Sequence, residues 1–247
     1  EAAAMVSAGN TGATMAAALL RWGRIPGIDR PAIAGVLPTE RGGTILLDVG
    51  ANVDCKPKNL VQFALMGSIY ARNILGITSP RVGLLNVGEE STKGNELTQA
   101  TYPLLEQAGL NFYGNVEGRD IFQGTVDVVI CDGFVGNVVL KTGEGLADVL
   151  MKMIKREMQS NGLARIGSLL ALPALKQLKK RLDYSEYGGA PLLGVNGVAI
   201  VCHGSSRALA IKNALCRARE AAETGLVKSI SIFLKTLAGK VGSVDGV

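Results

Sequence analysis

The chain has 247 residues, a net charge of +5, and 47% apolar against 19% charged residues. This length is enough to bury a full hydrophobic core, and the apolar content excludes an intrinsically disordered chain. A charge of +5 is too small to indicate nucleic-acid binding, although it suits an acidic partner or an anionic membrane surface.

The sequence predicts neither a metal site nor a cofactor. Its four cysteines form no CxxC pair, and His203 is its only histidine, which argues against zinc. Free cysteines fit a reducing cytoplasm, and the opening residues do not resemble a signal peptide. Because Ala4–Ser7 reads as the end of a strand, we expect a further N-terminal segment to be missing from this sequence. The cysteines are Cys55, Cys131, Cys202 and Cys216.

One pattern recurs along the chain: a short apolar run, a loop of small or polar residues, and then a helical pattern. The predicted strands are residues 3–6, 44–49, 81–86, 126–131 and 198–202. Apolar strands that alternate with helices are typical of a mostly parallel sheet with helices on both faces. We therefore predict a single α/β domain over residues 1–247, built as a three-layer α/β/α sandwich. Ligands of such sheets bind beyond the carboxyl ends of the strands, where the polar loops lie.

The first polar loop is SAGNTG (7–12), followed by a predicted helix over 13–22. Its backbone N–H groups at a helix start favour an anion, which makes Ser7, Gly9, Asn10 and Thr11 candidates for binding phosphate. The alternative is an ordinary helix cap formed by Asn10 or Thr11.

The loop EESTKGNE (89–96) is the densest in charge. Lys93, flanked by Gly94, could reach a phosphate as a point charge, and Asn95 lies beside it. A solvated loop with mutually offsetting charges is the alternative.

Two further loops carry acids and amides: Asp48, Asn52 and Asp54 in one, Asp132 and Asn137 in the other. They could orient substrates or act as acid and base, or they could form Asx turns and helix caps. For Asn137 we favour a cap at the start of a long helix. His203 directly follows the last predicted strand, where it could carry a proton or be a structural histidine.

Two helical stretches follow residue 137. In the helix over 138–158, Leu146, Leu150, Met153 and Ile154 are spaced to form one buried face. The stretch over 163–182 pairs leucines with basic residues and lacks acids, as a helix in a membrane interface would. The alternative is ordinary packing, with the leucines buried against the sheet or a dimer partner. We expect Pro173 to break the stretch into two short helices, so that residues 160–183 project as a basic amphipathic hairpin. Its predicted membrane contacts are Leu169, Leu170, Leu172, Lys176, Lys179 and Lys180.

Taken together, the loops resemble those of the bacterial acyl carrier protein:phosphate acyltransferase family. The matching stretches are VSAGNTGA (6–13), LLDVGANVDCKP (46–57), GLLNVGEESTKGNEL (83–97), GNVEGRDI (114–121), DVVICDGFVGNVVLKT (127–142) and GGAPLLGVNGVAIVCHGSS (188–206). They span nearly the whole chain, and chance agreement of all six is remote.

The resemblance implies the fold of phosphotransacetylases and of isocitrate and isopropylmalate dehydrogenases, assembled as a homodimer. It also implies a cytoplasmic enzyme, peripherally bound to the membrane, that moves an acyl group from acyl carrier protein to inorganic phosphate in phospholipid synthesis. The acyl phosphate would pass to a membrane glycerol-3-phosphate acyltransferase. The candidate catalytic residues are Lys93, Asp132, Asn137 and His203. Those for binding substrate or phosphate are Ser7, Gly9, Asn10, Thr11, Asp48, Asn52, Asn95, Asn115, Glu117, Gly133 and Gly204.

Direct attack of phosphate on the thioester needs neither a strong base nor a strong acid, because phosphate is already anionic and a thiol is a good leaving group. We therefore expect catalysis by positioning and electrostatics, and consider an acyl-enzyme on Cys131 or Cys202 the weaker alternative. A nicotinamide-dependent dehydrogenase of related fold lacks a convincing dinucleotide motif here. A non-catalytic membrane scaffold would leave the polar loops unexplained.

Overall fold

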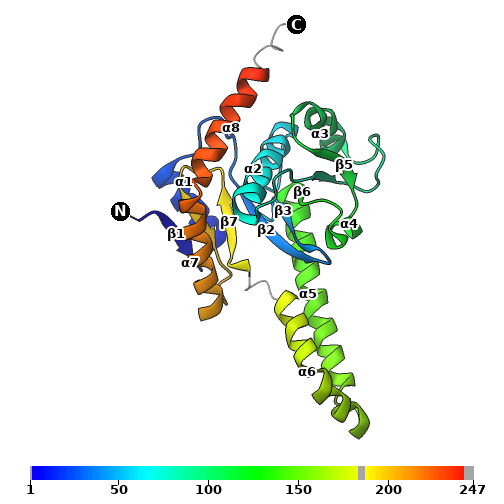
Figure 1. Ribbon diagram of the computed structural model, residues 1–247. Coiled ribbons are helices and arrows are strands. Elements are labelled where there is room, and N and C mark those ends of the chain that lie inside the picture. The colour runs from blue at the N-terminus through cyan, green and yellow to red at the C-terminus, as the bar shows by residue number, and fades with distance from the viewer. Residues whose placement is uncertain (1, 183–186, 242–247) are drawn as a thin grey trace.

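The computed structural model describes residues 2–182 and 187–241. Strands and helices alternate along most of the chain, as predicted (Figure 1). In chain order the elements are β1 (Ala4–Ser7), α1 (Thr11–Trp22), β2 (Ala32–Thr39), β3 (Gly42–Leu47), α2 (Pro57–Leu75), β4 (Val82–Leu85), α3 (Glu96–Gln107), β5 (Phe112–Val116), α4 (Gly118–Gln123), β6 (Val128–Ile130), α5 (Gly133–Glu157), α6 (Gly162–Leu182), β7 (Ala190–Leu193), β8 (Val198–Val201), α7 (Ala208–Glu223) and α8 (Leu226–Val241).

The strands form one mixed sheet in the order β1-β8-β7-β2-β3-β6-β4-β5. β3, β6, β4 and β5 are mutually parallel, and β1 is parallel to β8. Between these two parallel blocks lie β7 and β2, which pair antiparallel with each other and with their outer neighbours. The two blocks therefore run in opposite directions along the sheet.

Helices cover both faces of the sheet and enclose two hydrophobic cores, as expected of a three-layer sandwich. The larger core packs α2, α7 and α8 on one face, with Phe63, Leu60 and Ile230 fully or almost fully buried. The smaller core lies on the other face, where Ala18 of α1 and Ile121 of α4 meet the sheet. Local sequence agrees with these elements: Pro57 opens α2, where its missing N–H costs nothing, and Gly76 ends it in the left-handed conformation.

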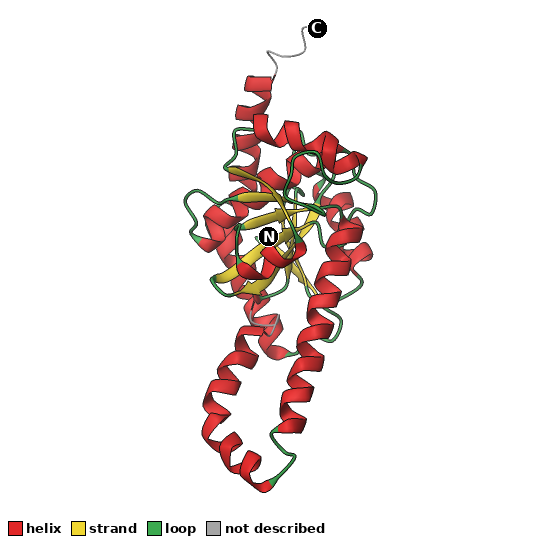
Figure 2. Ribbon diagram, turned by 90° about the vertical axis from the view of Figure 1, so that its right-hand side faces the viewer, coloured by secondary structure: helices red, strands yellow, loops and turns green. Residues whose placement is uncertain are grey.

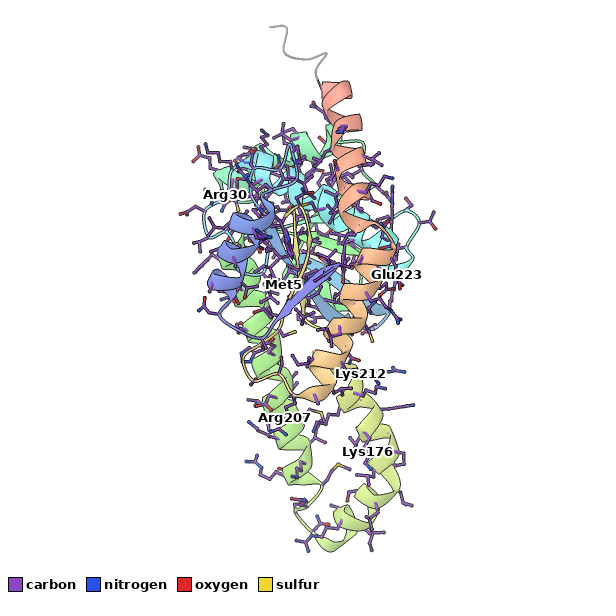
Figure 3. The ribbon with its side chains drawn as sticks, turned by 90° about the vertical axis from the view of Figure 1, so that its left-hand side faces the viewer. Met5, Arg30, Lys176, Arg207, Lys212 and Glu223 are labelled. Atoms are coloured by element: carbon purple, nitrogen blue, oxygen red, sulfur yellow. The ribbon has the colours of Figure 1, made fainter. Side chains whose placement is uncertain are left out.

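α5 and α6 extend together beyond the body of the molecule as an antiparallel pair (Figures 1 and 2), and Figure 3 shows Lys176 on the projecting α6. The projecting hairpin is therefore formed by α5 and α6, with its turn between Glu157 and Gly162, rather than within residues 160–183. The predicted break at Pro173 is also wrong, because α6 is assigned as one helix with this proline inside it. Figure 2 shows that α6 bends, which a proline explains because it cannot donate its backbone hydrogen bond.

The predicted buried face of the helix over 138–158 is not buried in this chain. Leu146, Leu150, Met153 and Ile154 are 37–58% exposed, because this part of α5 has left the body of the molecule. On α6, Leu163, Ile166, Leu169 and Leu170 are 63–82% exposed. No helix in the described part of the chain is long and apolar enough to cross a membrane.

Candidate active site

Asp48 organises the loop that follows β3. Its side chain is completely buried and accepts hydrogen bonds from the backbone N–H groups of Ile33, Gly50, Ala51 and Asn52, at 2.7–3.2 Å. The Asn52 amide also donates to Asp48 Oδ2 at 2.9 Å and to the Pro31 carbonyl at 2.7 Å. Asp48 and Asn52 thus hold the loop from beneath, and a contact between Asp48 and phosphate stays a prediction.

Burial raises the pKa of Asp48, and the hydrogen bonds that favour its charged form oppose this rise only in part. The carboxylate is thus held in a costly environment by the groups around it. It fixes the backbone of residues 48–52, against which the N-terminus of α5 packs.

Helix α5 begins directly against this loop. The Gly133 N–H donates to the Asn52 carbonyl at 2.7 Å, and a Cβ on Gly133 would lie 2.7 Å from the same oxygen. Asp132 caps the helix, since its Oδ1 accepts from the Val135 N–H at 2.9 Å. The capping role predicted for Asn137 is therefore wrong. Asn137 instead lies exposed in the second turn of the helix, where a Cβ on Gly50 would be 3.6 Å from its side chain.

The N-terminus of α5 has few donors left for an anion. Gly133, Val135 and Gly136 already donate their N–H groups to Asn52 and Asp132. Binding of substrate or phosphate at Gly133 stays a prediction, and its N–H is already donated to the Asn52 carbonyl. What this region can offer a substrate is the partly exposed Asp132 carboxylate and the exposed Asn137 amide.

The Lys93 loop follows β4 at the same edge of the sheet. It is closed on itself: the Asn86 amide donates to the Lys93 carbonyl at 3.0 Å, and the Lys93 N–H donates to the Glu90 carbonyl at 3.0 Å. Gly94 has a φ of +102°, and a Cβ there would overlap Thr98 Oγ1 and Asn86 Oδ1. The loop holds the backbone of Lys93 firmly while its side chain stays exposed.

The neighbouring candidates have structural partners. Asn95 caps α3 by accepting from the Thr98 N–H at 3.0 Å. Asn115 is buried and donates to the Glu90 carbonyl at 2.7 Å, while its Oδ1 has no hydrogen-bond partner among the described residues. Glu117 caps α4 and lies 3.2 Å from Arg119. The buried Asn115 amide supports the Lys93 loop from within.

The remaining candidates form a second group, on the loops after β1 and β8. Asn10 caps α1 by accepting from the Ala13 N–H at 3.0 Å, which confirms the capping interpretation. Ser7 Oγ lies 2.9 Å from Thr14 Oγ1, and the Ser7 carbonyl accepts from the Cys202 N–H at 2.7 Å. His203 is exposed, with Nδ1 2.6 Å from Ser205 Oγ. A Cβ on Gly204 would be 3.9 Å from the Ala8 carbonyl, so the two loops are adjacent, and Gly9 and Thr11 are exposed in the first.

Strand pairing separates the candidate residues into these two groups. Each loop does follow the carboxyl end of a strand, as predicted. However, β1 and β8 run opposite to β3, β6 and β4, so pairing places the two groups at opposite edges of the sheet. A single wholly parallel sheet would have placed them all at one edge.

The thiols near these loops are poor nucleophiles. Burial raises the pKa of Cys131 well above its usual value, and the nearby Asp132 and Asp48 raise it further. Burial likewise raises the pKa of Cys202, and raises that of Cys55 to about 11. Within residues 2–182 and 187–241, no group of three or more His, Cys, Asp or Glu side chains could hold a metal ion.

Sequence reasoning missed the residues that shape the loops. Asn86 and Gly94 fix the backbone around Lys93, and Gly136 allows α5 to approach Asp48. The glycines at 94 and 136, each inside a polar loop or at a helix start, were the available signal.

Comparison with known proteins identifies the family. A family model described as "Fatty acid synthesis protein" matches residues 1–229. The "Phosphate acyltransferase" of Pelotomaculum thermopropionicum is 64% identical, over 96% of this chain and 69% of that protein. The "Phosphate acyltransferase" of Heliobacterium modesticaldum is 61% identical, over 98% of this chain and 72% of that protein.

Two solved structures share the fold. The EutD phosphotransacetylase from Staphylococcus aureus has a TM-score of 0.57 at 14% identity, covering 95% of this chain and 63% of that one. A phosphotransacetylase from Streptococcus pyogenes has a TM-score of 0.53 at 16% identity, covering 95% of this chain and 64% of that one. This chain thus spans less than two thirds of either structure, and the likeness confirms the fold class. On the family match and the identity to its relatives, the chain belongs to the phosphate acyltransferase family of fatty acid synthesis proteins.

Proposed function

We propose that this protein transfers an acyl group from acyl carrier protein to inorganic phosphate, giving acyl phosphate and the free carrier thiol. The observation that carries the proposal is the 64% identity, over 96% of this chain, to a protein named phosphate acyltransferase. The reaction forms a bond from a phosphate oxygen to the acyl carbonyl carbon and breaks the carbon–sulfur bond. The sulfur leaves with the electron pair and takes up a proton.

The chemistry suits a site of positioned charges. Phosphate arrives as an anion, and the thiol that leaves has an ordinary pKa of about 8.5. The remaining problem is to bring a negative charge to a carbonyl and to stabilise a second one. Lys93, whose backbone is held by Asn86 and Glu90, is the cation we assign to phosphate. Asn137 and Asp132 lie at the same sheet edge, where we assign them to orient the reacting groups.

Direct transfer is favoured over an acyl-enzyme. The raised pKa values of Cys131 and Cys202 leave these thiols protonated at neutral pH, and thiols are far weaker nucleophiles than thiolates. Both cysteines are also buried, so an acyl–thioester would have difficulty reaching them.

Sheet twist changes the directions in which the two groups of loops point, although strand pairing places them at opposite edges of the sheet. Neighbouring strands rotate by roughly 20–25°, so the six steps from β1 to β4 add up to about 120–150°. Strands that are antiparallel by pairing are then turned so that their carboxyl ends point to similar sides. We propose that Lys93 and the loops after β3 and β6 form the reacting site, and that the loop of residues 7–12, with His203 and Gly204, forms a second polar group six strand spacings, or roughly 29 Å, away.

The finer parts of the proposal concern partners and location. We assign the exposed apolar face of α5 to a second copy of the chain. The exposed leucines and basic residues of α6 we assign to an anionic membrane surface. The cytoplasmic enzyme would then bind the membrane peripherally and deliver acyl phosphate to a membrane glycerol-3-phosphate acyltransferase. The acidic acyl carrier protein would approach along basic surfaces, in a salt-sensitive encounter.

The test is thiol release from acyl carrier protein by the purified full-length protein, followed with a thiol reagent at varied phosphate concentration. We expect release to saturate with phosphate and acyl phosphate to accumulate in equal amount. Thiol release that is independent of phosphate would indicate a hydrolase, and an absence of release would leave only a scaffold.

A further inference from the structure

A cavity lies at the opposite end of β3 from Asp48. Its volume is about 340 Å³, within the range of small-molecule sites. Thr44, near the start of β3, lines it, and Asp48 follows the end of the same strand, roughly 13 Å away at 3.3 Å per residue. The cavity is therefore separate from the loops described above.

Five segments distant in sequence converge on this cavity. They are the β2–β3 hairpin, the chain from the end of α2 to the start of β4, the residues before β6, Tyr187 before β7, and α7. Apolar side chains form much of its wall, including Val36, Leu75, Ile77 and Val126. Burial in this wall raises the pKa of Tyr187. A ligand here would need an apolar part.

The charged side chains of the cavity are mainly arginines. Arg41, Arg81 and Arg217 line it against a single carboxylate, Asp127. Arg81 Nε lies 3.4 Å from Asp127, and Arg217 Nη1 donates to Glu220, which lies outside the lining, at 2.8 Å. Arg41 is exposed and forms no ion pair within the described residues. Excess positive charge thus surrounds a half-apolar cavity.

We propose that this cavity binds a small organic phosphate, with its head at Arg41 and Arg217 and its apolar part against Val36, Ile77 and Val126. A phosphate monoester carries a charge of about −1.5 to −2 at pH 7. With Glu220 counted beside Arg217, the three guanidinium groups exceed the two nearby carboxylates by one positive charge, which Arg41 supplies. Guanidinium groups also bind phosphate through paired N–H donors. The Thr39 hydroxyl, which accepts from the Arg41 N–H at 3.2 Å, places a further polar group in the lining.

The volume of the cavity determines which ligand is used to test the proposal. With about 30 Å³ for each water in the liquid, 340 Å³ holds roughly eleven heavy atoms, the size of hexyl phosphate. Binding of hexyl phosphate is measured by calorimetry, alongside inorganic phosphate, hexanoate and hexanol. We expect hexyl phosphate to bind and the other three to bind at least about tenfold more weakly, because each lacks the apolar part or the second charge.

Variants locate the binding. Arg41→Ala and the milder Arg41→Gln should each weaken binding of hexyl phosphate about tenfold, the loss of one charged hydrogen-bonding group. Arg72→Ala removes an exposed arginine of α2 outside the lining and should leave the affinity unchanged. Lys93→Ala tests whether hexyl phosphate binds at the proposed catalytic loops instead of in this cavity, and it too should leave the affinity unchanged. No measurable binding, or binding that Lys93→Ala abolishes and the Arg41 variants leave intact, overturns the proposal.

Discussion

Gly136 of α5 packs so closely on Asp48 that a Cβ at position 136 would overlap the carbonyl oxygen of Asp48. Cys131 Sγ would lie 3.0 Å from the same added atom. Asp48 itself is held by the backbone of residues 33 and 50–52. The first turn of α5 and the loop after β3 therefore form one rigid unit.

Gly136→Ala should destabilise the protein by at least about 2 kcal/mol, because a backbone carbonyl cannot move aside as a side chain can. The matched control is Gly145→Ala in the same helix, where an added Cβ meets nothing within 4 Å. This control should be neutral or stabilising by up to about 1 kcal/mol, since alanine is the better helix former. Urea unfolding measures both, and equal stability of the two variants would contradict the packing described here.

Lys93→Ala should lower kcat/KM for phosphate, by an amount that corresponds to on the order of 3 kcal/mol of transition-state stabilisation, because its exposed side chain is assigned to phosphate. The unfolding midpoint should stay unchanged. Lys228→Ala, on exposed α8 surface, is the control and should retain full activity. If the folded Lys93→Ala protein keeps the phosphate dependence of the wild type, Lys93 is not part of the site.

Asp132 and Asn137 can be separated by their structural roles. Asp132→Ala loses the cap of α5 and should cost about 1 kcal/mol of stability, whereas Asp132→Asn keeps an acceptor for the Val135 N–H. Asn137→Ala should leave stability unchanged and lower kcat. Full activity in Asp132→Asn and Asn137→Ala would assign both side chains to structure alone.

The thiols should differ in their reactivity. Exposed Cys216 should react with iodoacetamide first at pH 8, followed much later by half-buried Cys55 and buried Cys131. In the folded protein the pKa of Cys55 is about 11, above the ordinary value of 9.0. The protonated thiol therefore contributes to the free energy of unfolding below pH 9, and this contribution is lost as the pH rises through 11. Mass spectrometry follows the labelling. Inactivation by Cys131→Ala in a folded protein would instead favour an acyl-enzyme.

Membrane contact through α6 predicts that a Leu169→Glu, Leu172→Glu variant loses co-sedimentation with vesicles of phosphatidylglycerol and phosphatidylcholine. Both leucines are exposed, and each basic residue near an anionic surface adds about 1 kcal/mol. Leu20→Glu, on exposed α1 outside the hairpin, is the control and should bind as the wild type does. Equal binding of the double variant would place the membrane contact elsewhere.

The sequence predicted the fold class because five strands are short, mostly apolar runs that each lead into a polar loop. It missed β2, β5 and β7, which contain Gly35 and Pro38, Gly114, and Pro191. Glycine and proline weaken strand patterns in a single sequence, and only tertiary pairing compensates for them. Two of the missed strands, β2 and β7, are the antiparallel ones that reverse the sheet, so its two directions could not be foreseen.

The candidate site was predicted in part. The loops were found because polar residues at strand ends stand out against apolar strands. The sequence could not tell that Asp48 and Asn115 point inward, because an inward carboxylate or amide has the same local pattern as an outward one. The exposed face of α5 was misjudged for a related reason: periodicity shows that a helix has an apolar face, without showing what covers it.

The length of helix α5 also sets the distance between the turn of the projecting hairpin and the loops at the other end of the helix. α5 is one continuous helix of 25 residues, about 37 Å long at 1.5 Å per residue, with Asp132 at one end and the turn of the projecting hairpin at the other. Any surface that the turn touches therefore lies at a fixed distance from the loops around Asp48 and Lys93. If that surface is a membrane, as proposed, we expect an acyl phosphate formed at those loops to begin its transfer well above it, so that its handover would need a receiving protein rather than direct partitioning into lipid.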